Sequence, residues 1–150
     1  MHNSIDLARQ KLLDGGYTCV VLVDNCEYNS FERGVKPLIT FLQMKRAFSG
    51  AVAADKCVGA GAAHLYVLLG VRAVWAGVMS SAAVEVLTKH GIEIVYEQVV
   101  PHIINRKGDG ICPIEKAVAN AKTSQEAYGR ILTTLHNLGQ NAKNDINNVH

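Results

Sequence analysis

AVAADKCVGAGAAHLYVLLGVRAVWAGVMSSAAVEVLTKHGIEIVYEQV, residues 51–99, decides the fold, because short apolar runs alternate there with helical segments. The pattern predicts strands at 51–54, 71–76 and 92–99, and helices at 56–69 and from Ser80 or Ser81 to about His90. Gly70 and Gly91 follow the two helices, where a glycine commonly ends a helix. Two successive strand-helix-strand units predict parallel strands, right-handed crossovers and helices packed on the sheet.

The flanking segments add an antiparallel hairpin and further helices. Asp24-Asn25 forms a tight-turn signal between two strand-like runs, and Pro37 suits the first turn of a helix. Thr123-Ser124-Gln125-Glu126 is a capping box that opens the last helix. The predicted elements are a helix at 3–14, strands at 17–23 and 27–31, and helices at 36–46, 113–121 and from 123 to about 138.

Length and composition predict one domain at 1–138 followed by a frayed tail at 139–150. The chain has 150 residues, with 15 Lys+Arg against 13 Asp+Glu, and no basic run exceeds two residues. We therefore expect neither nucleic acid nor a membrane surface as a partner. No apolar run approaches the roughly 20 residues of a membrane span, and no signal peptide is recognised. A cytoplasmic location with four reduced cysteines is the expectation.

Cys112 is the best candidate for chemistry. It follows the glycine-rich basic loop Arg106-Lys107-Gly108-Asp109-Gly110 and precedes Pro113, a residue suited to the first helical position. Glu115 stands where a capping-box acid would stand. Orphan amides and the helix dipole at this point favour a thiolate. The alternative is an inert, buried cap.

Polar residues also follow the two parallel strands, where ligands of open α/β sheets bind. Asp55 is predicted as the cap of the helix at 56–69, with an ordinary cap favoured over a ligand role. Lys56, in the first turn, is either a solvated cation or a functional one, because the dipole disfavours it there. Ser80 and Ser81 are most simply caps. Arg33 and Arg106 add positive charge that would suit an anion.

Gly59 and Gly61 lie inside the predicted helix, at a cost of about 1 kcal/mol each relative to alanine. Something must approach the backbone closely there. Packing of the helix on the sheet is the simpler interpretation, and access for a ligand is the alternative. His64 and Cys57 match no metal template and are interpreted as core or flanking residues.

The order of these motifs resembles an uncharacterised family of small bacterial proteins within the cytidine deaminase-like superfamily. The likeness spans about residues 5–135, and its most specific pieces are Arg33-Gly34-Val35-Lys36-Pro37-Leu38, Asp55-Lys56, and Cys112-Pro113 with Glu115. The resemblance implies a three-layer α/β fold with a mixed sheet, an antiparallel hairpin plus parallel strands, and helices on both faces. Superfamily members commonly form dimers or tetramers, so a homo-oligomer remains open.

The residues that bind zinc in such deaminases have no counterpart. A zinc deaminase carries H-x-E at the start of one helix and P-C-x-x-C at the start of the next. Here these positions read Asp55-Lys56-Cys57-Val58-Gly59 and Val78-Met79-Ser80-Ser81-Ala82. We predict no zinc site and no other cofactor, and we do not expect deamination by zinc-activated water.

Two functional interpretations of different classes remain. In the favoured one, the chain binds an anionic, nucleobase-like or nucleotide-like small molecule at helix N-termini, because no general base can be assigned. The residues expected to hold it are Arg33, Asp55, Lys56, Ser80, Ser81, Arg106 and Glu115. In the alternative, Cys112 is the nucleophile or redox thiol of an enzyme. A third interpretation makes the domain an oligomerisation unit.

Overall fold

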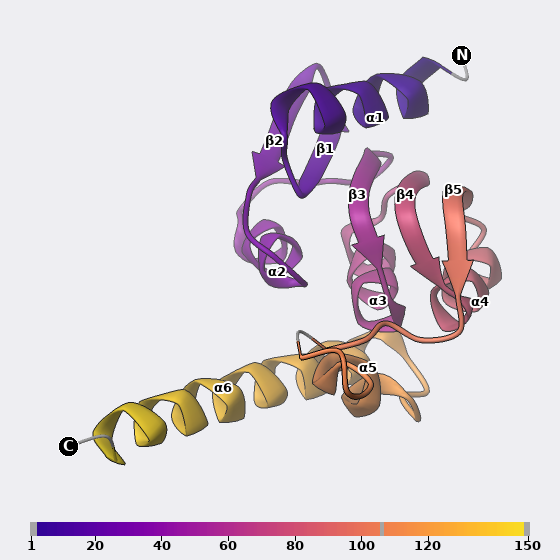
Figure 1. The fold of residues 1–150 in the computed structure, drawn as a ribbon. Helices are drawn as coiled ribbons and strands as arrows, with labels where there is room; N and C mark the ends of the chain where they lie inside the picture. Colours follow the sequence, from indigo (N-terminus) through magenta and orange to yellow (C-terminus); the bar gives the residue numbers. More distant parts are fainter. Residues whose placement is uncertain (1–2, 106, 149–150) are drawn as a thin grey trace.

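Within the described residues, five strands form one mixed sheet in the order β2-β1-β3-β4-β5 (Figure 1). The computed structural model describes residues 3–105 and 107–148. β1 is antiparallel to both of its neighbours, whereas β3, β4 and β5 are parallel. The mixed sheet predicted from the sequence is therefore confirmed. The strands are β1 (Cys19–Val23), β2 (Cys26–Ser30), β3 (Val52–Val58), β4 (Ala73–Ser80) and β5 (Glu93–Val100).

The hairpin between β1 and β2 closes as predicted. Val23 pairs with Cys26, which leaves Asp24 and Asn25 as a two-residue turn. Their φ angles are 49° and 64°. A type I′ turn needs positive φ at both central positions, and Asp and Asn tolerate that conformation better than most residues do.

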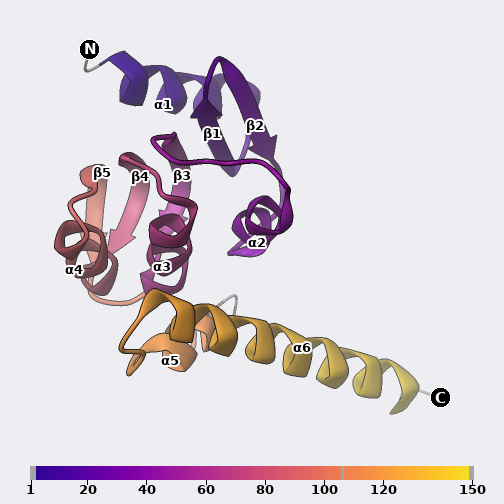
Figure 2. The ribbon, with the colours of Figure 1, turned by 180° about the vertical axis from the view of Figure 1, so that it is seen from behind.

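Helices cover both faces of the sheet, as predicted (Figures 1 and 2). α1 packs alone on one face, and α2, α3 and α4 pack on the other. α5 and α6 lie beyond the carboxyl ends of β3, β4 and β5. No helix in the described part of the chain is long and apolar enough to cross a membrane. The helices are α1 (Asn3–Gly15), α2 (Lys36–Gln43), α3 (Ala60–Leu69), α4 (Ser81–Lys89), α5 (Pro113–Val118) and α6 (Ser124–Asn148).

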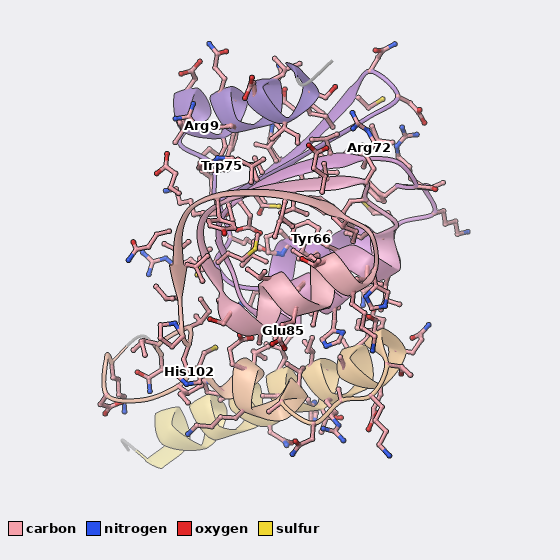
Figure 3. The ribbon with its side chains drawn as sticks, turned by 90° about the vertical axis from the view of Figure 1, so that its right-hand side faces the viewer. Arg9, Tyr66, Arg72, Trp75, Glu85 and His102 are labelled. Carbon is pink, nitrogen blue, oxygen red and sulfur yellow. The ribbon has the colours of Figure 1, made fainter. Side chains whose placement is uncertain are left out.

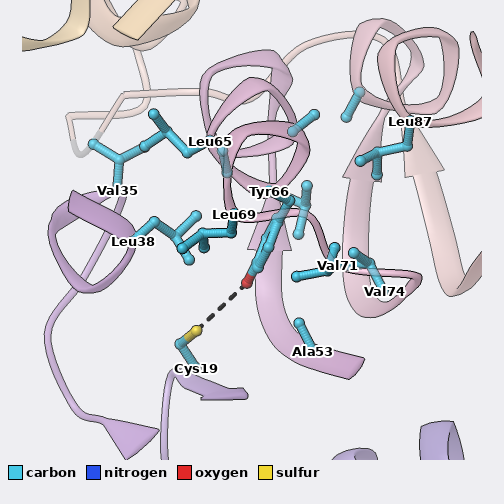
Figure 4. Packing of buried hydrophobic residues seen from close by; sticks show 14 of the residues in the cluster. Cys19, Val35, Leu38, Ala53, Leu65, Tyr66, Leu69, Val71, Val74 and Leu87 are labelled. Atoms are coloured by element: carbon cyan, nitrogen blue, oxygen red, sulfur yellow. Dashed lines mark hydrogen bonds between the residues drawn. The ribbon is translucent and has the colours of Figure 1, made fainter. Parts of the chain in front are cut away.

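Strand alternation divides the core between the two faces. Ala54 and Trp75 belong to the smaller cluster under α1, whereas Ala53 and Val74 belong to the larger cluster under α2, α3 and α4 (Figure 4). Arg9 of α1 places its guanidinium 5.5 Å from the centre of the Trp75 ring (Figure 3). This cation–π contact covers the edge of the smaller cluster.

The prediction that Asp55 caps a helix is wrong. β3 runs through Asp55 and Lys56 to Val58, and α3 begins only at Ala60 with Gly59 as its N-cap. Asp55 pairs with Cys19 on one side and with Ala76 on the other. Two strand partners therefore satisfy the backbone here, and they override the preference of Asp for helix caps.

Helix ends also differ from the prediction. α6 continues to Asn148, although we expected the helix to stop near Leu138. The frayed tail expected at 139–150 stays a prediction. Residues 139–148 contain no proline, so nothing blocks the backbone hydrogen bonds there. α2 ends at Gln43 and α5 at Val118, each about one turn earlier than predicted.

Candidate functional site

Glu115 caps a helix other than its own. Its Oε1 accepts a hydrogen bond from the amide of Ala60 at 2.7 Å, and its Oε2 accepts one from the amide of Gly61 at 3.0 Å. Gly59, the N-cap of α3, has no side chain to serve these two amides. A carboxylate at this point is also stabilised by the positive end of the helix dipole. Glu115 therefore does not close a capping box on α5, as the sequence had suggested; Cys112, the N-cap of that helix, has no side-chain cap bond.

Gly59, the N-cap of α3, and Gly61 in its first turn allow α5 to approach. A Cβ atom on Gly59 would lie 2.5 Å from the carboxyl carbon of Glu115, and one on Gly61 would lie 2.5 Å from Cγ2 of Ile114. The sequence left open whether the sheet or a ligand approaches this backbone. The structure shows that helix α5, through Glu115 and Ile114, approaches this backbone.

A groove of about 720 Å³ opens beside this contact. It lies between α3 and α4 on one side and α5 with the first turn of α6 on the other, and the segment after β5 completes it. Glu85 and His102, both labelled in Figure 3, belong to its lining. Its polar and charged residues are His64, Ser80, Glu85, Lys89, His90, His102, Glu115, Lys116, Lys122, Thr123, Ser124 and Gln125.

Three helix N-termini reach this groove. Ala60 begins α3, Ser80 and Ala82 mark the start of α4, and Ser124 begins α6. Each N-terminus carries a partial positive charge because its first amides lack helical partners. Three lysines and two glutamates line the same groove. Both carboxylate oxygens of Glu115 already accept hydrogen bonds from amides of α3.

Ser80 and Ser81 occupy different positions. Ser80 is 1% exposed and caps α4, its Oγ accepting the amide of Ala83 at 3.1 Å. The prediction of a serine cap is confirmed. Ser81 is exposed, lies outside the lining of the groove and places its Oγ 3.4 Å from the carbonyl of Val100.

Asp55 is buried away from the groove, in a polar chain inside the larger cluster. The hydroxyl of Tyr66 donates to its Oδ2 at 2.7 Å and lies 3.4 Å from Sγ of Cys19 (Figure 4). The amide of Cys57 donates to its Oδ1 at 3.2 Å. Burial raises the pKa of Asp55 to about 7, although these hydrogen bonds oppose the shift. The carboxyl of Asp55 therefore titrates inside the core and does not line the groove.

Cys112 is half-buried and does not line the groove. Its amide donates to the carbonyl of Ile103 at 3.0 Å. α5, which it precedes, has only six residues, so the dipole available to its thiol is small. At Cys57, desolvation of the thiol, with Asp55, Glu115 and Cys112 nearby, raises the pKa to about 11.

The predicted basic residues do not meet in the groove. Arg33 and Lys56 are exposed, one in the segment before α2 and the other within β3, and neither lines it. Arg106 lies outside the described residues. Of the predicted site residues, Ser80 and Glu115 are brought to the groove. The ligand roles assigned to the others stay predictions.

The sequence did not identify a buried pair in the groove wall. Nδ1 of His64 on α3 lies 3.0 Å from Oγ of Ser124 on α6, and each residue is 7% exposed. Burial, followed by the nearby His90 and Lys89, lowers the pKa of His64. The two residues are 60 positions apart. Their only sequence signal was a polar histidine inside an apolar helix.

The positions that would hold zinc in a deaminase offer no donor set. The start of α3 reads Gly59-Ala60-Gly61, and α4 begins at Ser80 and Ser81, whose hydroxyls are bonded to backbone groups. Among the residues that the structure describes, no group of three or more His, Cys, Asp or Glu side chains could hold a metal ion. The residues present do not fit a zinc centre.

Solved structures provide a fold comparison. A DUF1893 family protein from Thermotoga maritima is 21% identical, with 89% of this chain and 90% of that chain covered and a TM-score of 0.82. A diaminohydroxyphosphoribosylaminopyrimidine deaminase/reductase from Thermotoga maritima is 18% identical over 64% of this chain and 34% of that chain, with a TM-score of 0.40. A dCMP deaminase from the cyanophage S-TIM5 is 11% identical over 64% and 95%, with a TM-score of 0.43.

Sequence comparison settles the family. No curated protein matches the chain. The model of a domain of unknown function, DUF1893, matches residues 7–135. That range covers most of the chain, and the resemblance to an uncharacterised family is confirmed. The chain belongs to the DUF1893 family.

Proposed function

We propose that the chain binds an anionic small molecule, nucleobase-like or nucleotide-like in size, in the groove between α3, α4, α5 and α6. The observation that carries this proposal is that the N-termini of α4 and α6 meet Lys116 and Lys122 in one groove. Helix N-termini bind phosphates and carboxylates because their amides point outward and their dipoles favour negative charge.

The fold itself contains an example of such binding. The first amides of α3 hold a carboxylate, that of Glu115, at 2.7 and 3.0 Å. This leaves the N-termini of α4 and α6 and the lysines for a ligand from solution. A cavity of about 720 Å³ falls in the range of small-molecule sites.

The proposal requires no zinc chemistry. It draws on backbone amides and lysine side chains, and the starts of α3 and α4 supply no metal ligands. A bound phosphate would be recognised by charge and by N–H donors.

A thermal-shift titration with inorganic phosphate and with a nucleoside 5′-monophosphate tests the proposal. A ligand at about 100 times its Kd stabilises the folded state by about 2.7 kcal/mol, which raises Tm by several degrees. Combined Lys116→Ala and Lys122→Ala substitutions are expected to remove most of this rise. Lys45→Ala, which deletes a lysine outside the groove lining, is the matched control and is expected to retain it. An equal rise in both variants, or none in the parent chain, would overturn the proposal.

A further inference from the structure

We propose that Ser124 and His64 are a nucleophile and its general base, and that they act on an ester of an anionic small molecule bound in the same groove. This inference rests on the proposed function for the substrate's position. It assigns a reaction to two residues that the sequence had placed in a helix cap and in the core.

The geometry is that of an activated serine. Oγ of Ser124 and Nδ1 of His64 are 3.0 Å apart, within the range expected for a nucleophile and its base. The two side chains come from different helices, α6 and α3, and both line the groove. Because each is 7% exposed, bulk water has little access to the bond between them.

The surroundings keep the imidazole available as a base. Burial, followed by the nearby His90 and Lys89, lowers the pKa of His64, which favours the neutral ring at neutral pH. The other polar groups of packed elements that line the groove with it are Ser80 and Glu85 at α4, Glu115 and Lys116 of α5, and Ser124 and Gln125 of α6. A neutral ring with a free Nδ1 can accept the hydroxyl proton of Ser124.

Amide donors stand beside the nucleophile. Ser124 and Gln125 are the first two residues of α6, where the N–H groups have no partner within the helix. The amide of the third residue, Glu126, is already bonded to Oγ1 of Thr123 at 3.0 Å. The first two amides are therefore the donors available to an oxyanion that forms next to Oγ of Ser124.

The reaction balances without a cofactor. Oγ of Ser124 forms a bond to the ester carbonyl carbon while its proton passes to Nδ1 of His64. The carbon–oxygen bond of the ester then breaks, and the departing alcohol takes that proton. Water attacks the resulting acyl-serine with His64 again as base. The products are a carboxylic acid and an alcohol, and both residues return to their initial states.

A fluorophosphonate probe tests the pair without knowledge of the substrate. Oγ of Ser124 would bond to phosphorus, fluoride would leave, and His64 would take the proton. Peptide mass spectrometry after digestion is expected to place the adduct on Ser124. Ser49, an exposed serine outside the groove, is the internal comparator and is expected to stay unmodified. Absence of the adduct, or equal labelling of Ser49, would overturn the inference.

A substituted histidine separates catalysis from a merely structural hydrogen bond. His64→Gln keeps a polar side chain that can still bond to Ser124, but it cannot act as a base. We expect the labelling rate to fall about 100-fold or more, while a thermal melt shows that the variant remains folded. An unchanged labelling rate would mean that the contact between His64 and Ser124 only holds α3 and α6 together, and it would refute the inference. The proposed function is tested separately by titrating the Ser124→Ala variant with phosphate. This variant lacks the proposed nucleophile, and phosphate should still stabilise it if the groove binds anions.

Discussion

Glu115 of α5 and Ala60 of α3 form the contact that shapes the groove: the carboxylate oxygen lies 2.7 Å from the amide nitrogen. Gly59, the N-cap of α3, has no side chain, so the first amides of this helix would otherwise be exposed. The acid from α5 satisfies two of them and fixes the position of α5 against α3. One wall of the groove therefore depends on a charge that the neighbouring helix supplies.

Replacing Glu115 by Gln should lower the free energy of unfolding by about 1–2 kcal/mol. A glutamine side chain has one acceptor oxygen, so it cannot accept from both amides, and it loses the interaction with the dipole. Chemical denaturation measures the change. Glu97→Gln is the control. The Glu97 side chain is 61% exposed, and its ion pair with Arg9 is long, at 3.6 Å. This substitution is expected to lower the free energy of unfolding by about 0.5 kcal/mol or less. Equal costs in the two variants would contradict the capping role.

Gly61→Ala should destabilise the protein by about 1–3 kcal/mol, although alanine favours a helix. The new Cβ would lie 2.5 Å from Cγ2 of Ile114, so α5 would have to move. Gly129→Ala is the matched comparison, because a Cβ there meets nothing within 4 Å and should stabilise α6 by up to about 1 kcal/mol. Urea unfolding of both variants measures whether each substitution lowers or raises the free energy of unfolding. Stabilisation by both substitutions would mean that α5 does not press on α3.

Asp55 should make the stability fall as pH rises from about 4 to 7. Its folded-state pKa of about 7 exceeds the ordinary value of 3.8, so the folded state binds the proton more tightly than the unfolded chain does. The contribution is complete below the unfolded pKa and is lost as pH rises through the folded one, with an upper limit of about 4 kcal/mol.

The Asp55→Asn variant isolates this contribution, because it has no carboxyl to titrate. Subtracting its unfolding free energy from that of the parent chain at each pH should give a difference that decreases from pH 4 to pH 7. Parallel curves would show that the carboxyl titrates normally in the fold. Tyr66→Phe removes the 2.7 Å hydrogen bond to Asp55, which favours the charged carboxyl. The folded-state pKa of Asp55 should therefore rise further, and the decrease in stability should extend to higher pH than in the parent chain.

Local signals predicted much of the architecture. The Asp24-Asn25 turn, the helix that begins with Pro37 in its first turn and the cap by Ser80 all arise from interactions among residues close in sequence. Such interactions depend on backbone conformation and side-chain chemistry within one or two turns. They are visible in a sequence because no distant partner is needed to form them.

The errors at the candidate site concern residues whose partners are distant in the sequence. Asp55 looks like a cap until β1 and β4 pair with it, and Glu115 looks like a capping-box acid until α5 meets α3. The contact between His64 and Ser124 joins residues 60 positions apart. Each is decided by tertiary packing, which a local pattern cannot reveal.

The most direct test of the groove as an anion site is a ¹H–¹⁵N NMR titration with a nucleoside 5′-monophosphate, with inorganic phosphate in parallel. The account predicts saturable shifts that are largest for the amides of Ala82, Ser124 and Gln125, which lie at the N-termini of α4 and α6. The amide resonances of α1, which packs on the opposite face of the sheet, should not shift. Shifts confined to Arg33 and Lys56, or no saturable shift with millimolar ligand, would contradict the account.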